Sequence, residues 1–196
     1  MQTTAATFSL KEIGIDRTNQ IVEVWTTTIT DLLRALTVQT SNIFARNMQK
    51  RSLIELQKKL NPSVVSDKSQ FFLFNNGQAA QSCIVKYNVK KSTMDGSLEE
   101  LKIIEISDNP HTIFQTSEVR RNITINCIEQ IKKFTQIYRF PTITISVNSH
   151  TDEIFFSRMG FKKYDTKKPD IMTFYTTGFF HPDVQRKRKH QWNLLR

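Results

Sequence analysis

The stretch "ITISVNSHTDEIFFSRMGFKKYD", residues 143–165, constrains the fold more than any other part of the chain. Apolar and polar residues alternate over 141–148, and this period of two predicts a strand. Ser149, with Asp152 three residues later, predicts that a short helix begins there as in a capping box. Gly160 stands where the backbone turns left-handed after a helix, a conformation that favours glycine. The stretch is therefore expected to fold as strand, short helix and strand.

The same signals predict the other elements. Asp16 can cap a first helix, and Asn61-Pro62 stops a second one that begins at about Ser41. Asn76-Gly77, between two apolar runs, predicts a hairpin. In chain order we expect a strand at 8–15, two helices, two strands within 70–89 and a strand at 99–107. A helix over 117–138, the strand at 141–148 and a helix ending at Met159 should follow. The last two strands, at 161–165 and 171–177, should pair around Pro169-Asp170.

Apolar residues repeat at helical spacing in the first two helices, which predicts one buried face on each. These residues are Ile21, Trp25, Ile29, Leu32, Leu33 and Leu36 in the first helix, and Ile43, Phe44, Met48, Leu53, Leu56 and Leu60 in the second. The strand at 99–107 is apolar enough to be expected buried on both faces.

A chain of 196 residues with 38% hydrophobic content supports one core. The order of elements predicts a single α/β or α+β domain with a central mixed, mostly antiparallel sheet of six to seven strands, flanked by about four helices. One parallel junction is expected where a helix crosses between two central strands. This domain is expected to span 1–180, and a basic tail to span 181–196.

Several classes of protein are excluded by composition. The sequence has no run of 18 apolar residues, so no membrane span is expected, and its first residues lack the features of a secretory signal. Cys83 and Cys127 are too far apart in sequence for a CxxC pair, and the four histidines lack metal-ligand spacing. We expect no metal, two buried thiols, and a reducing intracellular compartment, cytoplasmic or organellar.

The stretch 143–165 resembles the C-terminal half of the GNAT acyltransferase superfamily. In that family a strand is followed by a short helix ending in Tyr-x-x-x-Gly-Phe and then by a strand; here Phe156, Gly160 and Phe161 stand at the Tyr, Gly and Phe positions. The order of elements is also similar to that family from Phe8 to about Thr177. The resemblance implies that Gly160 ends the helix and that Phe161 plugs the core.

The resemblance implies acyl-coenzyme A, most simply acetyl-CoA, as the acyl donor. It would lie in a gap between two parallel strands similar to 101–107 and 142–148, with its pyrophosphate at the start of the helix that follows the first strand. Glycines let a backbone approach phosphates, and a helix N-terminus supplies positive potential. The residues that the resemblance assigns to the donor site are Ile106, Arg120, Arg121, Asn122, Ile123, Thr124, Ile125, Asn148 and Phe156.

The sequence departs from the family pattern in its phosphate loop. The family loop reads Arg/Gln-x-x-Gly-x-Gly/Ala; if Arg120 is its first residue, Ile123 and Ile125 replace the glycines. If Arg121 is first, Thr124 and Asn126 replace them instead. The tyrosine that protonates the leaving thiolate is replaced by Phe156, which has no hydroxyl.

Glu105 lies within the strand at 99–107, where partial burial would raise its pKa and suit it to act as a base. The alternative is a carboxylate that pairs with a nearby lysine or arginine, and Asp108 is a weaker candidate base. Arg120 and Arg121 can hold a pyrophosphate by charge, because guanidinium groups match phosphate bidentately. Two arginines in the first turn of a helix oppose its dipole unless an anion is present.

Two functions remain open from the sequence. One is an acyl-CoA-dependent N-acyltransferase of divergent sequence, which transfers an acetyl group to an amine on a small molecule or protein, with Glu105 as its base. The other is a catalytically inactive binding or structural subunit of a larger assembly, which the missing glycines, the missing tyrosine and a net charge of +10 favour.

The tail supplies a possible docking segment for a protein or nucleic-acid partner. Arg186, Lys187, Arg188 and Lys189 lie together, and the segment 186–196 contains no acidic residue. If the tail binds nucleic acid, the logarithm of the binding constant should fall with the logarithm of salt concentration by about 0.9 per phosphate contact. Deleting 186–196 should then remove most of this slope in a titration at several salt concentrations. An unchanged affinity and slope would show that the tail does not bind nucleic acid.

Overall fold

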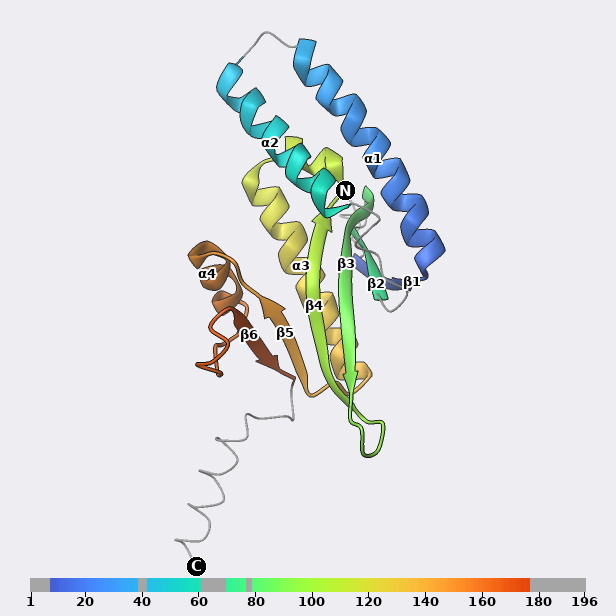
Figure 1. Cartoon of the computed structure of the whole chain (residues 1–196), viewed down its shortest axis with the longest axis vertical. Helices are drawn as coiled ribbons and strands as arrows, with labels where there is room; N and C mark the ends of the chain where they lie inside the picture. Colours follow the sequence, from blue (N-terminus) through green and yellow to red (C-terminus); the bar gives the residue numbers. More distant parts are fainter. Residues whose placement is uncertain (1–7, 39–41, 61–69, 77–78, 177–196) are drawn as a thin grey trace, which may run out of the picture. The chain divides into compact units, whose positions relative to one another are not determined.

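Six strands form one mixed sheet in the computed structural model, in the order β1-β2-β3-β4-β5-β6 (Figure 1). The model describes residues 8–38, 42–60, 70–76 and 79–176. The β1–β2, β2–β3 and β5–β6 pairs are antiparallel, and the β4–β5 pair is parallel. The predicted fold class, a mixed and mostly antiparallel sheet with one parallel junction, is confirmed.

Apart from the strand expected at 161–165, the elements lie close to their predicted positions. They are β1 (Phe8–Ile13), α1 (Ile15–Val38), α2 (Ile43–Lys59), β2 (Gln70–Asn76), β3 (Ala79–Lys91), β4 (Leu98–Asp108), the 3-10 helix η2 (Pro110–Phe114), α3 (Ser117–Ile137), β5 (Thr142–Ser146), α4 (His150–Arg158) and β6 (Ile171–Tyr175). None of the helices described is long and apolar enough to cross a membrane. The chain divides into two compact units, 1–88 with 104–130, and 89–103 with 131–196.

In the first unit, α1 and α2 pack on one face of the sheet. Ile21, Trp25, Ile29 and Leu36 of α1 and Leu53, Leu56 and Leu60 at the end of α2 form a buried cluster with Phe71, Leu73 and Ile84 of the sheet. The α1 residues are those that the helical spacing predicted, and Leu32 and Leu33 pack against the cluster half-buried. Asp16 is not the cap, because α1 already begins at Ile15 and the carboxylate lies in its first turn.

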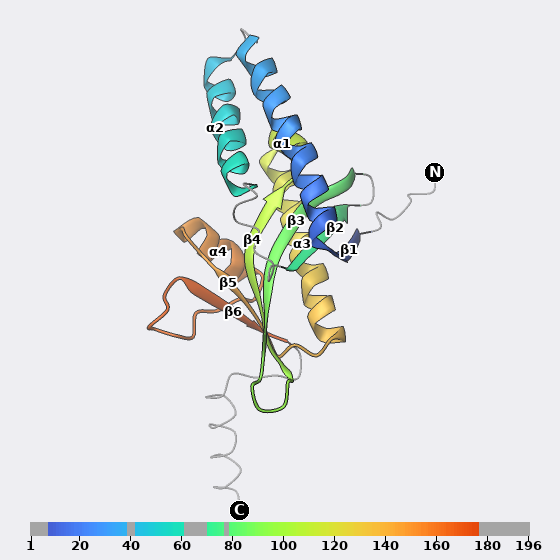
Figure 2. The same ribbon diagram turned by 45° about the vertical axis from the view of Figure 1, so that its right-hand side comes forward.

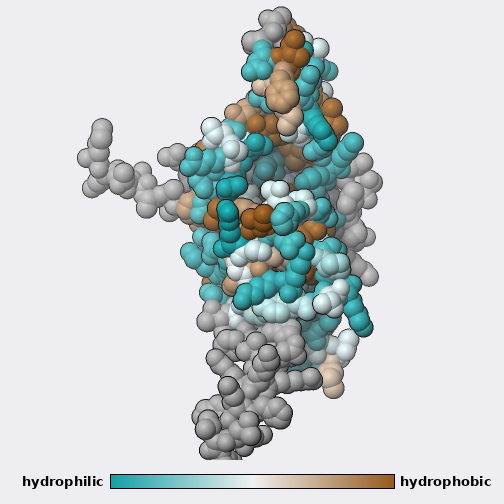
Figure 3. All heavy atoms as spheres, turned by 90° about the vertical axis from the view of Figure 1, so that its left-hand side faces the viewer, coloured by the Kyte–Doolittle hydropathy of each residue, from teal (hydrophilic) through white to brown (hydrophobic). Residues whose placement is uncertain are grey.

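The first half of α2 differs from the expectation. Asn42 caps the helix by accepting a hydrogen bond from the Ala45 N–H at 3.1 Å. Ile43, Phe44 and Met48, expected in the core, are 62%, 78% and 53% exposed. Figure 3 shows apolar atoms at the surface of the α1–α2 pair. Helical spacing alone cannot distinguish a buried stripe from an exposed one, because both have the same period.

The β2–β3 hairpin supplies alternating faces to the sheet. Phe71, Leu73 and Ile84 belong to the cluster under α1 and α2. Because successive side chains of a strand point to opposite faces, Phe72 and Cys83 face the other side, where the Cys83 thiol hydrogen-bonds to Cys127 of α3. Both cysteines are buried and free, as predicted. The turn at residues 77 and 78 lies outside the described residues.

Burial along β4 also departs from the expectation. Leu101 and Ile103 are fully buried, whereas Ile104 is 39% exposed. The strand is therefore not buried on both faces along its whole length. After β4, Asn109 accepts a hydrogen bond from the His111 N–H and begins η2, a turn that the sequence did not reveal. Ile113 of η2 packs against the cluster under α1 and α2.

In the second unit, α4 ends in a Schellman motif. Ser149 caps its start by accepting a hydrogen bond from the Asp152 N–H at 3.1 Å, as predicted. At its end the Phe161 N–H donates to the Phe156 carbonyl at 3.1 Å and the Gly160 N–H donates to the Ser157 carbonyl at 3.0 Å. The motif's usual apolar contact is the edge-to-face pair of Phe156 and Phe161, whose ring centroids are 5.7 Å apart.

The segment after Gly160 is not the strand that was predicted over 161–165. Only Lys162 pairs with β6, through an isolated bridge to Thr173. Phe161 is 1% exposed, which confirms that it plugs the core. This single buried ring is followed by exposed residues at 162–165, so the segment does not form a strand of the sheet.

Lys132 of α3 contacts both the end of α4 and β6 in the second unit. Its Nζ donates to the Met159 carbonyl at 2.7 Å and lies 4.6 Å from the centre of the Phe174 ring. The Lys132 ammonium therefore contacts both the negative end of the α4 dipole and the face of an aromatic ring. These two contacts offset the cost of burying most of the lysine side chain.

Replacing Gly160 with alanine should destabilise the protein. Its φ is +86°, and an added Cβ would lie 3.5 Å from the Phe174 ring. A left-handed alanine costs about 1–2 kcal/mol of unfolding free energy, measurable by chemical denaturation. The 3.5 Å separation is an ordinary van der Waals contact, so Gly96→Ala, at φ +71° with nothing within 4 Å, should show a similar backbone cost, and Gly14→Ala, which has no left-handed φ, should change the free energy little. Equal effects at Gly14 and Gly160 would contradict the analysis.

Candidate functional site

β4 continues beyond its pairing with β5. The described register runs from Glu100 opposite Thr142 to Ile103 opposite Ile145, whereas β4 extends to Asp108. From residue 104 onward, β4 therefore has no β5 partner in the described register. These last residues of β4 belong to the first unit. Peptide groups that have no partner in a neighbouring strand need another hydrogen-bond partner.

Glu105 lies in this uncovered part of β4. The side chain is half-buried, and loss of hydration raises the pKa of its carboxyl, while the positive charges of Lys59 and Lys86 act against this rise. A carboxylate with a raised pKa is a better proton acceptor than an ordinary glutamate at neutral pH. Glu105 is therefore chemically suited to serve as a base.

Asp108 ends the strand and is more deeply enclosed. Burial raises the pKa of its carboxyl, and the charges of Lys59 and Arg120 oppose the rise. Its Oδ1 atom is buried and has no hydrogen-bond partner among the described residues. A buried acceptor left unpaired costs free energy, so this oxygen is a place where a donor from outside the chain would be stabilising.

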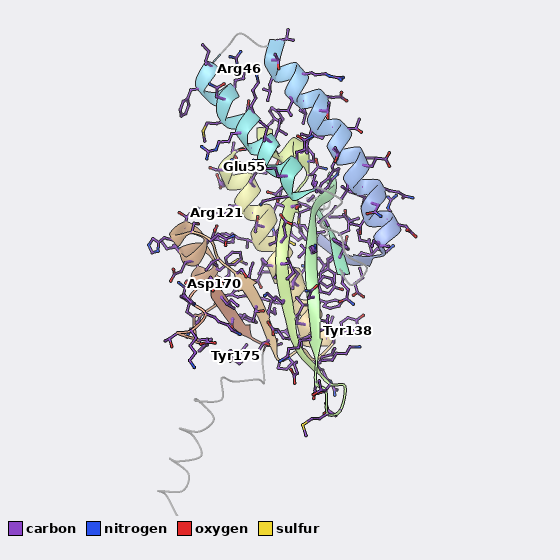
Figure 4. The ribbon with its side chains drawn as sticks, in the orientation of Figure 1. Arg46, Glu55, Arg121, Tyr138, Asp170 and Tyr175 are labelled. Carbon is purple, nitrogen blue, oxygen red and sulfur yellow. The ribbon has the colours of Figure 1, made fainter. Side chains whose placement is uncertain are left out.

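Arg120 and Arg121 lie in the first two turns of α3. The Nε of Arg120 is buried and unpaired among the described residues, and the guanidinium acts on Asp108 through its charge without forming an ion pair with it in that part of the chain. Arg121 is exposed on the same helix (Figure 4). The two side chains thus differ: Arg120 is partly enclosed beside a carboxylate, and Arg121 is open to solvent.

The backbone of 122–125 does not form a phosphate cradle. α3 begins at Ser117, so residues 122–125 lie within the helix, where N–H groups donate to carbonyls four residues earlier. The Arg120 N–H is already used, because it donates to the Thr116 carbonyl at 3.1 Å. Ile123 is 4% exposed and is a core residue, and the Thr124 hydroxyl donates to the Arg120 carbonyl. The expectation that this backbone holds a pyrophosphate conflicts with the helical bonding.

The segment before α3 bonds mainly to itself. The Thr112 and Gln115 N–H groups donate to carbonyls of the same turn, the His111 N–H donates to the Asn109 side chain, and the Asn109 N–H donates to the Ser82 carbonyl at 3.0 Å. These bonds use part of the N–H groups of the segment, and Glu118 adds a negative charge to the first turn of α3.

Two further residues assigned by the resemblance belong to the second unit. Phe156 is 8% exposed and its ring packs edge-to-face with Phe155 and Phe161. Asn148 is exposed just before the cap of α4. In the first unit, Ile106 is half-buried on β4, and Asn122 and Ile125 lie on α3, exposed and half-buried respectively.

Sequence reasoning missed the two lysines around Glu105. Lys86 lies two residues after Ile84 on β3, so the hairpin register places it on the face covered by α1 and α2. Lys59 is in the last turn of α2. The hairpin register could have indicated the face of Lys86, but its proximity to Glu105 depends on how distant segments pack. Within the described residues, no group of three histidines, cysteines or carboxylates is arranged to hold a metal ion.

No family model and no curated protein matches the sequence. Solved structures similar to it include a probable acetyltransferase from Staphylococcus epidermidis, 12% identical with a TM-score of 0.47, the match covering 87% of this chain and 100% of that one. An acetyltransferase of the GNAT family from Listeria monocytogenes is also 12% identical, with a TM-score of 0.47, over 88% and 96% of the two chains. FeeM, an N-acyl amino acid synthase from uncultured soil microbes, is 9% identical, with a TM-score of 0.48, over 90% and 94%.

Replacing Asp108 with asparagine should change how stability depends on pH. The folded-state pKa of Asp108 is raised above the ordinary 3.8, so the folded protein binds more protons than the unfolded chain between these two values. The wild type should lose stability relative to Asp108→Asn as pH rises through this window, in urea unfolding at a series of pH values.

Asp31→Asn is the matched control, because Asp31 is exposed in a surface pair with Arg34. It should show little change over the same window, since surface pairs contribute little. If Asp108→Asn instead became less stable than the wild type as pH rose, Arg120 would have to stabilise the charged carboxylate more than burial destabilises it.

Proposed function

We propose that the protein is an acyl-CoA-dependent N-acyltransferase that transfers an acetyl group to an amine. The observation that carries this proposal is the segment of β4 beyond its β5 pairing, which combines a strand end without a β5 partner in the described register with the half-buried Glu105. N-acyl transfer needs both features: a rigid edge to which the amides of an extended donor can hydrogen-bond, and a base for the incoming amine.

Each residue has a defined role in this proposal. Glu105 accepts a proton from the amine as the amine attacks the thioester. The N–H of Ile106, on the same strand, is a candidate donor to the oxygen on which negative charge develops in the tetrahedral intermediate. Phe156 carries no hydroxyl, so the leaving thiolate takes its proton from water.

Side chains replace the backbone in binding the pyrophosphate of the donor. Several N–H groups of the segment before α3 bond within the chain, and the segment contains no glycine, so its backbone differs from the glycine loop of the family. Arg120 and Arg121 supply positive charge at the same end of α3, and an anion bound at this end would relieve their opposition to the helix dipole. In the absence of ligand, Asp108 offsets part of the charge of Arg120.

A second candidate function is a binding or structural subunit without transfer activity. The observation in its favour is that the N–H groups of Asn109, His111, Thr112, Gln115 and Arg120 bond within the chain itself. In that case the basic tail, which lies outside the described residues, would be the segment that docks on a protein or nucleic-acid partner.

Calorimetric titration with acetyl-CoA and with coenzyme A distinguishes the two candidates. The wild type should bind both, and Arg120→Ala/Arg121→Ala should weaken binding at least tenfold, because each charge-assisted hydrogen bond contributes about 1.5–3 kcal/mol. Glu105→Gln should still bind the donor but lose roughly 10²-fold or more in transfer rate. An absence of binding by the wild type would leave the subunit function.

The matched control is Arg17→Ala/Arg51→Ala. These arginines are exposed on α1 and α2, where they hydrogen-bond to Gln20 and Glu55 of the same helices. The control removes the same formal charge as the test variant. Equal loss of affinity in both variants would mean that net charge alone, and no specific site on α3, attracts the donor.

A further inference from the structure

The α1–α2 hairpin carries exposed apolar side chains at one end. Its two helices pack against each other, and only residues 39–42 separate the last residue of α1 from the first residue of α2. The last turn of α1 and the first turns of α2 therefore lie at the same end of the hairpin. Four large apolar side chains in these turns are more than half exposed: Val38, Ile43, Phe44 and Met48. We call these four residues the hairpin end, and all of them belong to the first unit.

The apolar exposure on this side of α2 does not continue past Met48. Residues three and four apart share a side of a helix, so Phe44 and Met48 are followed on their side by three charged residues, Arg51, Glu55 and Lys58. All three of these charged residues are exposed. A protein groove that received α2 along its length would have to bury them, which is costly. A contact made by the hairpin end alone leaves them in water.

The hairpin end lies in a segment without acidic residues. Residues 32–54 contain no aspartate or glutamate and four basic residues, which are Arg34, Arg46, Lys50 and Arg51. Asp31 and Glu55, just outside the segment, form exposed pairs with two of these arginines, and such pairs are weak. Residues 31–55 thus carry four basic and two acidic side chains, so they attract an anionic surface and repel a second copy of themselves.

The basic side chains extend from the hairpin end back along both helices. Figure 2 shows the end of the hairpin, where α1 leads into α2, well beyond β1 and β2 of the same unit. Figure 4 shows Arg46 near that end of α2 and Glu55 nearer the other end. At an α-helical rise per residue, Arg51 lies about 10 Å from Phe44 along the α2 axis. This spacing matches the roughly 5–10 Å to which apolar side chains enter a membrane interface below the charged headgroups.

We propose that the hairpin end binds the surface of an anionic lipid bilayer. Ile43 and Phe44 enter the interface, and Lys50 and Arg51 contact the lipid phosphates. A bilayer offers an apolar layer behind an anionic one to any projecting end, without a pocket of matching shape. A nucleic acid offers the anionic layer alone, and a second copy of the hairpin would be repelled. This inference does not depend on the proposed acyl transfer.

Sedimentation of the full chain with lipid vesicles tests the proposal. Vesicles of phosphatidylcholine alone are compared with vesicles of equal parts phosphatidylcholine and phosphatidylglycerol. We expect at least tenfold stronger binding to the anionic vesicles, because each basic side chain near an anionic surface contributes roughly fivefold. The preference should decrease as salt concentration rises, since salt screens exposed charges.

Replacing the apolar side chains shows whether they enter the bilayer. Ile43→Ser/Phe44→Ser should weaken binding to anionic vesicles roughly tenfold or more, because the variant buries less apolar surface. The matched control is Ile137→Ser/Tyr138→Ser, which removes another exposed aliphatic and aromatic pair, at the end of α3. It should bind as the wild type does. Thermal unfolding followed by circular dichroism checks that both variants are folded. An equal loss of binding in the two variants would overturn the assignment of the hairpin end.

Replacing the basic side chains tests the contact with the headgroups. Lys50→Gln/Arg51→Gln should weaken binding to anionic vesicles roughly tenfold or more at low salt, and much less at high salt. Arg17→Gln/Lys58→Gln is the matched control, because it removes the same two side-chain types from the opposite end of the hairpin. The control should retain most of the binding. An equal loss in both variants would mean that net charge alone, and no contact at the hairpin end, attracts the vesicles.

The basic tail is a competing source of attraction to anionic vesicles. The apolar variant is therefore also measured in a full chain in which Arg186, Lys187, Arg188 and Lys189 are replaced by glutamine. We expect this chain to bind anionic vesicles and to lose binding through Ile43→Ser/Phe44→Ser. If neutralising the tail abolishes binding, and the apolar variant has no effect in the wild type, the tail binds the vesicles and the proposal is wrong. No binding of the wild type to anionic vesicles would also overturn it, and would leave the hairpin end to an acidic protein partner.

Discussion

The short parallel ladder between β4 and β5 is the constraint on which the candidate site depends. It joins Glu100–Ile103 to Thr142–Ile145 and then stops, although β4 continues to Asp108. A parallel pair needs a crossover connection, here η2 and α3, so the strand end, the turn and the helix start follow one another directly in the chain. Ligands of open α/β sheets usually bind at the carboxyl ends of strands for this reason.

Competition between burial and charge determines the chemistry at this end of β4. Burial alone would favour the protonated form of Glu105 and Asp108, and cations alone would hold both ionised. Lys59 acts on both carboxyls, so a change in its charge or position would move both pKa values in the same direction. The readiness of Glu105 to accept a proton is therefore a property of the group of charges, and a bound anion near Lys59 would raise it by screening the cation.

Sequence signals confined to a few adjacent residues were sufficient to predict much of the fold. The cap at Ser149 and the left-handed conformation of Gly160 each satisfy the backbone at one end of a helix, and few residue types can do this. The structure contains both as predicted. The exposure of Phe44 and the isolated bridge of Lys162 depend instead on which segments pack together, and periodicity carries no information about that. The same limit applies to the site: Glu105 could be identified from its strand, but its two lysines come from other elements.

The absence of glycine before α3 changes how an anion can be bound there. A glycine loop at the start of a helix lets backbone N–H groups approach a phosphate closely. In this chain the turn after β4 uses its N–H groups internally, and Asn109 anchors it to the Ser82 carbonyl. Guanidinium groups that bind a phosphate instead lose side-chain entropy on binding and are screened by salt when exposed. Arg120 pays less of this cost than Arg121, because its Nε is already buried beside Asp108.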